Sequence, residues 1–228
     1  MNQKSNKDQI TELGASEGVF TTAQAERLGI PRYALSYAVK AHNLEKVAHG
    51  AYRLSSSIDD GLDGVRAAYK LTNPSKFTHE RIGDAYDGIA VSNNTAAYML
   101  GIGNYHADPY SITTPTRFNS RRKDVAFRTA AIAPSEVIWL EGIPVTRPER
   151  TIADLHSGGD DVSLVAQTFV DAVRKYGTNQ FDIRILQKII GIEAIGELCI
   201  AAGITGTSAR LKYLDNEGHV AIFKRELY

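Results

Sequence analysis

The first quarter of the chain carries the apolar and polar pattern of a small helical unit followed by a hairpin. Apolar residues recur at helical spacing up to about residue 41, and the pattern then changes to one that suits two short strands. It predicts helices over residues 6–15, 22–28 and 31–41, strands over residues 44–48 and 51–54, and a His49-Gly50 turn. Three helices and a hairpin in this order are the layout of a winged helix-turn-helix.

Local signals set the bounds of the two central helices. Thr21 and Gln24 have the spacing of a capping box, so Thr21 is expected to begin the helix over residues 22–28. Gly29 is expected to end it, because glycine adopts the left-handed conformation at low cost. Pro31 suits the first turn of the next helix, since it has a fixed φ and no amide donor. The turn between the two helices must therefore be very short.

The helix over residues 31–41 has two unlike faces on a helical wheel. The inward face carries Pro31, Leu35, Ala38 and Val39. The outward face carries donors, flat rings and positive charge, which suit phosphates and base edges in the major groove. The hairpin would be the wing, facing the DNA backbone. The predicted DNA-binding residues are Arg32, Tyr33, Ser36, Tyr37 and Lys40 on the helix, and Lys46, His49 and Arg53 on the hairpin.

Charge is concentrated in the same stretch. Residues 27–53 contain five basic residues and one acidic residue, a net charge of +4, whereas the whole chain has 26 of each and is neutral. This concentration is typical of a nucleic-acid-binding surface. Residues 1–54 together carry only +2, from seven basic and five acidic residues. We therefore expect modest affinity from one copy, and two copies on adjacent half-sites. The alternative is a protein-binding winged helix with solvated lysines.

Small polar residues and glycines at residues 55–64 indicate a linker. We accordingly expect a DNA-binding domain over residues 1–56 and a second domain over residues 62–228. The second domain is predicted to be mixed α/β with a helical C-terminal part, which makes the fold class α+β. Its predicted elements are a helix at 65–71, a strand at 89–91, a helix at 95–100, strands at 110–114, 125–132 and 137–140, and helices from 162 onward with stops at Gly177, Gly191 and Gly203.

Two further patterns in the second domain each allow a structural and a functional interpretation. Thr146 and Glu149 form a second capping-box pattern around Pro148, which predicts a helix beginning there. On that helix Arg150 and Asp154 are four residues apart, so they can form a surface ion pair; the alternative is a surface that faces a partner. A separate basic cluster, Arg117, Arg121, Arg122 and Lys123, is either a solvated loop or a contact to DNA or to an acidic partner.

Composition narrows the class of protein. At 43% hydrophobic and 23% charged residues the chain resembles an ordinary soluble globular protein. It has no apolar run of the ~20 residues that a membrane helix needs, and its polar start is unlike a secretory signal. Cys199 is the only cysteine and the six histidines lack metal-ligand spacing, so we expect no disulfide, no metal and no cofactor in a cytoplasmic protein. We find no nucleophile-base pair and expect no enzymatic activity.

Several segments together resemble one family. The segments GVFTT, LGI and HGAYRL in the first domain, and IAVSNNTAAYMLGI, PYSITTP and GIPVTRPERTIADL in the second, are similar to the AbiE-type antitoxins (the AbiEi family) of type IV toxin-antitoxin systems. The resemblance spans residues 18–156, and it depends on the order and spacing of motifs that are each weak alone. The helical tail is less diagnostic.

The resemblance implies a protein with two roles. The winged helix would bind inverted repeats in the promoter of its own operon and repress it. The second domain would counter a nucleotidyltransferase-like toxin in an abortive-infection defence against phage. By the same analogy the DNA contacts are the outward residues of the second helix of the motif and the wing, as named above.

Two other classes of function stay open. A winged-helix transcription factor whose second domain senses a small molecule would have the same first domain, and a neighbouring toxin-like gene would argue against it. A nuclease fused to a winged helix would need clustered acids with a lysine at a sheet edge. Residues 62–228 show no such cluster.

Overall fold

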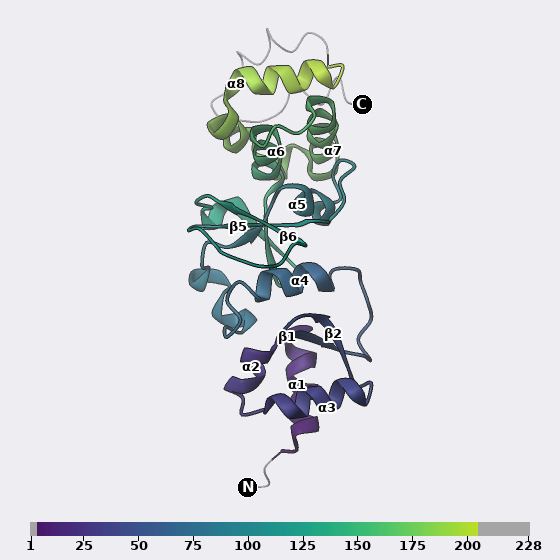
Figure 1. The fold of residues 1–228 in the computed structure, drawn as a ribbon. Coiled ribbons are helices and arrows are strands. Elements are labelled where there is room, and N and C mark those ends of the chain that lie inside the picture. The colour runs from purple at the N-terminus through teal and green to yellow at the C-terminus, as the bar shows by residue number, and fades with distance from the viewer. Residues whose placement is uncertain (1–3, 205–228) are drawn as a thin grey trace. The chain divides into compact units, whose positions relative to one another are not determined.

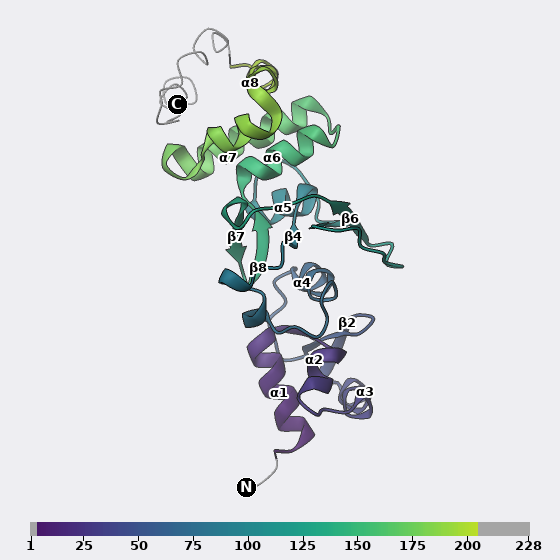
Figure 2. The same cartoon turned by 90° about the vertical axis from the view of Figure 1, so that its left-hand side faces the viewer.

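The computed structural model describes residues 4–204 and divides into two compact units. The first unit contains residues up to Ile89 together with Glu141–Ile143, and the second contains Ala90–Leu140 and the chain from Pro144 onward. Figures 1 and 2 show the helices and strands of each unit from two sides.

The first unit contains a winged helix-turn-helix, as the sequence predicted. Its elements are α1 (Asn6–Glu17), β1 (Val19–Thr21), α2 (Thr22–Arg27), α3 (Arg32–Lys40), β2 (Leu44–Ala48), β3 (Ala51–Leu54), α4 (Asp63–Lys70) and the short 3-10 helices η1 (Thr78–Glu80) and η2 (Gly83–Ala85). The strands form an antiparallel sheet in the order β1-β3-β2. Strand β1 was not predicted, because it has only three residues and all of them are buried.

The predicted helix signals in this unit are largely confirmed. Thr21 caps α2, with its side chain accepting from the Gln24 amide while the Gln24 side chain accepts from the Thr21 amide. Gly29 has a φ of +78°, so it turns the chain out of α2. Pro31 is in the extended conformation as the N-cap of α3 rather than in its first turn, so α3 begins one residue later than expected.

One core holds the three helices against the hairpin. It contains Ile10 and Leu13 from α1, Phe20 from β1, and Ala34, Leu35 and Ala38 from α3. Burying one such Leu or Ile side chain contributes about 1.5–3 kcal/mol. Helix α1 lies close to β3 at Gly14, where a Cβ atom would lie 2.5 Å from Leu54 Cγ.

Helix α4 and the segment after it also belong to the first unit. Val19, Ala51 and Ala67 form a second buried cluster, which joins α4 to β1 and β3. The predicted linker therefore lies inside this unit, between β3 and α4. Cutting the chain at residues 56–62 would separate α4 from the strands against which it packs.

The second unit is a mixed sheet with helices. Its elements are β4 (Ala90–Val91), α5 (Asn93–Leu100), β5 (Tyr110–Thr114), β6 (Val125–Thr129), η3 (Pro134–Glu136), β7 (Val137–Leu140), β8 (Ile143–Thr146), α6 (Pro148–Ser157), α7 (Val162–Gln180) and α8 (Ile183–Ala201). The strand order is β6-β5-β4-β8-β7, with β4 parallel to β8 and antiparallel to β5. Within this unit the helices lie on one side of the sheet (Figures 1 and 2).

Most elements predicted here are confirmed, with shifted ends. Helix α5 begins at Asn93 after the N-cap Ser92, and β6 ends at Thr129 instead of residue 132. Gly177 and Gly191 interrupt α7 and α8 with φ of +63° and +82°, as expected of stops. The last part of the predicted helical tail, from residue 205, lies outside the described residues.

The prediction of a second capping box, formed by Thr146 and Glu149, is wrong. Arg147, not Thr146, is the N-cap of α6, and its side chain makes no capping bond. The Thr146 and Thr151 hydroxyls share a buried hydrogen bond of 2.7 Å. The Glu149 carboxylate accepts from the Asp182 backbone amide at the start of α8. A tertiary partner thus takes the carboxylate that a capping box would use locally.

None of the helices within residues 4–204 is both long and apolar enough to cross a bilayer.

Candidate nucleic-acid interface

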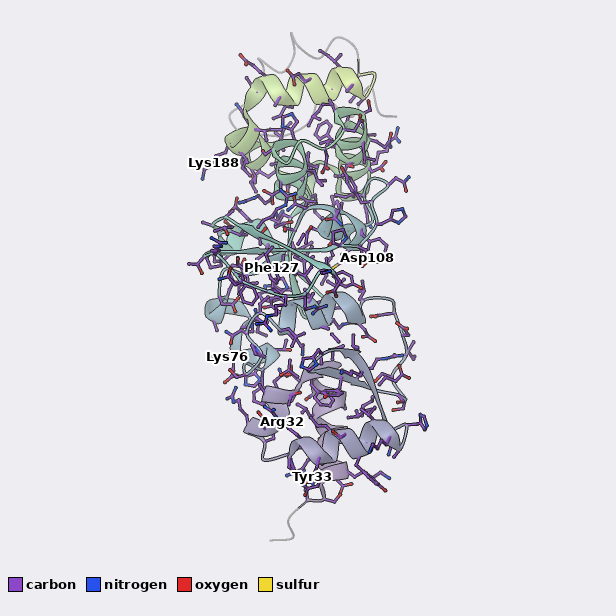
Figure 3. The ribbon with its side chains drawn as sticks, viewed as in Figure 1. Arg32, Tyr33, Lys76, Asp108, Phe127 and Lys188 are labelled. Carbon is purple, nitrogen blue, oxygen red and sulfur yellow. The ribbon has the colours of Figure 1, made fainter. Side chains whose placement is uncertain are left out.

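The outward face of α3 is open to solvent. Tyr33 and Tyr37 are 72% and 73% exposed, and Ser36 and Lys40 are exposed beside them. Among the described residues, the two tyrosine hydroxyls and the Lys40 ammonium have no hydrogen-bond or ionic partner. Figure 3 shows Tyr33 on the side of α3 that faces away from the sheet. The face thus presents two rings and a free cation.

This exposure follows from how α3 packs. Ala34, Leu35 and Ala38 occupy the buried face, and Val39 packs at its edge. Alanine at two of the three central positions lets the helix lie close to α1. The outward residues alternate with these at helical spacing, so they all point to solvent.

Arg32 is at the border of this face and already has an acidic neighbour. Its guanidinium donates to the Glu26 carboxylate, and the two side chains are 76% and 41% exposed. An exposed ion pair of this kind contributes little to stability, because solvent screens it. A DNA phosphate can therefore replace Glu26 at little cost.

The hairpin presents two of its three predicted contacts. Lys46 on β2 and His49 in the turn are exposed. The turn itself depends on Gly50, whose φ is +82°. Both side chains have no partner among residues 4–204, so they are available to a ligand.

Arg53 on β3 is placed differently. Its side chain is 13% exposed, and Nη2 lies 2.7 Å from Glu45 Oε2 while Nε lies 3.3 Å from Asp63 Oδ2. It also donates to the Ser57 carbonyl oxygen at 3.3 Å. The hydrogen bonds that Arg53 donates to the Glu45 carboxylate raise the pKa of Arg53, so its guanidinium stays charged. Because its donors are taken, we leave Arg53 out of the proposed DNA surface.

Arg27 is also paired, on the other side of the winged helix. It donates to both carboxylate oxygens of Glu80, at 2.6 and 3.0 Å, and its guanidinium lies 4.6 Å from the centre of the Phe77 ring. The hydrogen bond from Arg27 lowers the pKa of Glu80 to about 2. Of the five basic residues at 27–53, only Lys40 and Lys46 therefore lack an acidic partner within residues 4–204.

Residues 74–80, here called the strap, hold α2 from outside the winged helix. The Thr21 hydroxyl donates to the Pro74 carbonyl, and Gln24 Nε2 donates to the Lys76 carbonyl at 2.8 Å. Arg27 makes the contacts with Glu80 already described. Helix α2, which positions α3, is thus fixed by residues that follow α4 in the chain.

A buried ion pair ties the strap and α4 to α1. Lys70 Nζ lies 2.5 Å from Glu17 Oε2, and the two side chains are 8% and 6% exposed. Thr78 donates to the same carboxylate through its amide and its hydroxyl. Burial raises the pKa of Glu17, but Lys70 and Thr78 lower it by more, so the net shift is downward. Glu17 is therefore ionised at neutral pH.

A groove between α1 and α3 lies next to the exposed tyrosines. It has a volume of about 430 Å³ and is lined by residues that include Lys7, Ile10, Tyr33, Tyr37 and Asn43. Lys7 and Asn43 were not predicted as site residues. Only the packing of α1 against α3 brings them to this face, and nothing in their local sequence indicates it.

The basic cluster of the second unit lies in the connection between β5 and β6. Arg117, Arg121 and Lys123 are exposed, whereas Arg122 Nε donates to Asp124 at 3.1 Å. At the base of this connection the rings of Phe118 and Phe127 lie 4.6 Å apart (Figure 3 labels Phe127). The loop thus presents three exposed cations that have no ionic partner among the described residues.

Arg150 forms the predicted pair with Asp154, at 2.8 Å, but not on the surface. Arg150 is 9% exposed and also bonds Glu136 at 3.0 Å, so it joins α6 to η3. Its donors serve the fold of the second unit. Within residues 4–204 no group of three or more His, Cys, Asp or Glu side chains could hold a metal ion.

Together, three helices, the sheet β1-β3-β2 and an exposed α3 define the first unit as a winged helix-turn-helix, the class of many DNA-binding proteins. Residues 8–55 match the model of a protein family described as "Transcriptional regulator, AbiEi antitoxin". The resemblance to AbiEi antitoxins is confirmed over these residues. The match supports a DNA-binding regulator of the antitoxin class.

The fold of the chain as a whole has a counterpart among solved structures. The crystal structure of the Rv2827c protein from Mycobacterium tuberculosis is similar, with a TM-score of 0.55 and 14% sequence identity, covering 91% of this chain and 79% of that chain. At this identity the likeness concerns the fold alone. A search of curated proteins gave no match.

Proposed function

We propose that this protein is the antitoxin of a type IV abortive-infection system, which represses its own operon in the cytoplasm and neutralises a nucleotidyltransferase-like toxin. The observation that carries the DNA-binding half is the free outward face of α3 within the segment that matches the AbiEi family. It acts by binding, without catalysis.

In this proposal α3 enters the major groove and the hairpin follows the backbone. Tyr33, Ser36 and Tyr37 contact base edges and sugars, while Lys40 and Lys46 neutralise phosphates. Arg32 exchanges Glu26 for a phosphate, and His49 contacts the backbone from the turn. With two unpaired lysines on this surface, phosphate neutralisation by one copy is limited. Two copies on the half-sites of an inverted repeat supply the remaining affinity.

The pairing of two copies has its own test. Half-site spacing is a geometric property of a two-copy complex, so changing it by half a helical turn should weaken binding. A gel-shift titration on operators with altered spacing measures this. Equal affinity at every spacing would contradict the two-copy complex and leave one-copy binding intact.

Neutralisation of the toxin belongs, in this proposal, to the second unit. Arg117, Arg121 and Lys123 extend from an anchored loop and suit an acidic surface on a partner. A second contact with operator DNA is the other use of the same charges. The two uses differ in whether their loss affects rescue or repression.

The two roles are best separated in the full-length chain, because residues 62–89 pack with the winged helix. The variant Tyr33→Ala/Tyr37→Ala/Lys40→Ala should bind operator at least about a hundredfold more weakly, at about 1–2 kcal/mol per contact, and should fail to repress. All three side chains are exposed, so its thermal stability should be close to that of the wild type. Co-expressed with the toxin of the neighbouring gene, it should still restore growth.

The matched control changes charge on the second unit. Arg121→Ala/Lys123→Ala should repress normally if the loop faces the toxin, and should then fail to restore growth. Normal operator binding by the α3 variant would refute the DNA surface. Loss of rescue and repression together in that variant would show that the roles are not separable.

A further inference from the structure

The groove between α1 and α3 has the dimensions of a small-molecule site. Its volume of about 430 Å³ lies within the range of about 300–1,000 Å³ typical of ligand pockets. It lies wholly within the first unit. The family match and the proposed DNA contacts do not account for it.

The floor of the groove is apolar and firmly packed. Ile10 from α1 and Ala34 and Ala38 from α3 form it, with exposures of 4%, 8% and 7%. The small alanine side chains leave the space open. Tyr33 and Tyr37 stand at one wall, one helical turn apart, so two aromatic rings border an apolar floor.

Polar groups stand around this floor without partners. The groove is lined by Asn6, Asn43, Ser56 and the two tyrosines, and none of these side chains has a hydrogen-bond partner among the described residues. Lys7 is the one charged residue in the lining, and its ammonium is unpaired within residues 4–204. An apolar floor bordered by a few solvent-accessible polar groups and one cation favours a flat apolar ligand that carries one negative charge.

We propose that this groove binds a small planar aromatic carboxylate, with its rings against Tyr33 and Tyr37 and its carboxylate on Lys7. The rings cover the apolar floor and stack beside the tyrosines. The carboxylate pairs with Lys7, and the asparagine side chains donate to the same oxygens. A neutral compound of the same shape gains only the apolar part of this binding.

A consequence follows for regulation, and this part rests on the proposed DNA-binding function. Tyr33 and Tyr37 cannot stack on a ligand in the groove and contact base edges at the same time. The bound carboxylate also adds negative charge next to the phosphates. The ligand therefore competes with the operator and relieves repression.

The test uses the full-length protein with 2-naphthoate as the probe and 2-naphthamide as its neutral match. Calorimetric titration, without DNA, should show one site for naphthoate. Lys7→Gln should weaken naphthoate binding about threefold, the size of a partly exposed ion pair, and leave naphthamide unchanged. The control Lys4→Gln should have no effect, since Lys4 is paired with Glu12 and does not line the groove.

A second variant fills the space. Thr11 is exposed on α1 and lines the groove. The variant Thr11→Trp should therefore weaken naphthoate binding at least tenfold, while circular dichroism shows an intact fold. Absence of naphthoate binding to the wild type, or full binding to Thr11→Trp, overturns the site. Both results are obtained without DNA and do not bear on the proposed function.

Competition is measured afterwards by gel shift with operator DNA. The expected result is that naphthoate weakens operator binding by the wild type and not by Thr11→Trp. If naphthoate binds in the groove but leaves operator affinity unchanged, the competition is wrong and the ligand site stands. If the protein binds no operator at all, the proposed function fails and the binding result is unaffected.

Discussion

The winged helix uses polar side chains in opposite ways on its two sides. On α3 the tyrosines and Lys40 are exposed and have no partner among the described residues. On the side of α1 and α2, by contrast, Glu17, Gln24 and Arg27 all bond to α4 or to the strap. Polar groups that the fold leaves unpaired are available to a ligand, whereas paired groups stabilise the fold. This comparison, more than a count of charges, favours the α3 side as the proposed binding side.

A count of charges treats all basic residues alike, whereas in the structure some of them pair with acidic residues and others do not. Lys40 and Lys46 have no acidic partner in the part of the chain that the structure describes, but Arg27 pairs with Glu80, and Arg53 pairs with Glu45 and Asp63. Two of these acids, Glu80 and Asp63, lie beyond the hairpin in the chain. The apparent charge of +4 is therefore much reduced at the surface.

The largest effect should come from removing α4 and the strap, which pair with the polar side chains of α1 and α2. A fragment of residues 1–89 keeps α4 and the strap, whereas residues 1–56 lose the cover over Val19 and Ala51, which are both fully buried in the intact unit. Exposing this cluster and releasing the strap should cost about 5 kcal/mol. In urea the longer fragment should unfold cooperatively and the shorter one should not. Equal stability of the two fragments would show that α4 and the strap are dispensable. It would contradict the view that the paired side chains stabilise the winged helix.

The next effect concerns the buried ion pair. Glu17→Gln leaves Lys70 buried without its counter-ion, so the free energy of unfolding at pH 7 should fall by about 3–5 kcal/mol. Glu12→Gln removes an exposed pair with Lys4 on the same helix and should cost at most about 1 kcal/mol. Urea titration measures both. The double variant Glu17→Gln/Lys70→Met should recover much of the loss, because neither charge is then buried alone.

The same pair predicts a dependence on pH. Since the pKa of Glu17 is lowered in the folded protein, its contribution is present above the ordinary carboxyl value of 4.5 and is lost as pH falls through the lowered value. Wild-type stability should therefore decline more steeply below pH 4.5 than that of Glu17→Gln. Parallel curves would mean that Glu17 does not titrate in this way.

The smallest effect should distinguish unpaired from paired basic residues on the proposed DNA-binding surface. Lys40→Ala and Lys46→Ala should each reduce the slope of log affinity against log salt by about 1 and weaken specific and unrelated DNA alike. Arg53→Ala should leave the slope unchanged and instead lower stability, because it breaks the pairs with Glu45 and Asp63. Gel-shift titration over a range of salt makes the measurement. A reduced slope for Arg53→Ala would return that residue to the interface.

What the sequence could predict depended on how local the signal was. Neighbouring residues determine the Thr21 capping box, the Gly29 stop and the two faces of α3. The structure confirms all three predictions. Thr146 and Glu149 have the same spacing as Thr21 and Gln24, yet Glu149 bonds the start of α8 instead. A local pattern fails where a distant backbone amide offers a buried carboxylate a better partner.

The candidate site likewise contains features that the local sequence predicts and features that only tertiary packing determines. Exposure of the α3 residues follows from helical periodicity, so it could be predicted. The pairing of Arg53 with Asp63 and of Arg27 with Glu80 depends on tertiary packing of α4 and the strap, and no local rule indicates it. The groove beside Tyr33 and Tyr37 exists only because α1 crosses α3 at this point.

The close approach of α1 to β3 leaves an evolutionary signature. Because a Cβ atom at position 14 would collide with the Leu54 side chain, the two positions cannot drift independently. Relatives that carry alanine in place of Gly14 should carry a smaller residue in place of Leu54. Covariation between these two columns would report the distance between a helix and a strand without any coordinates.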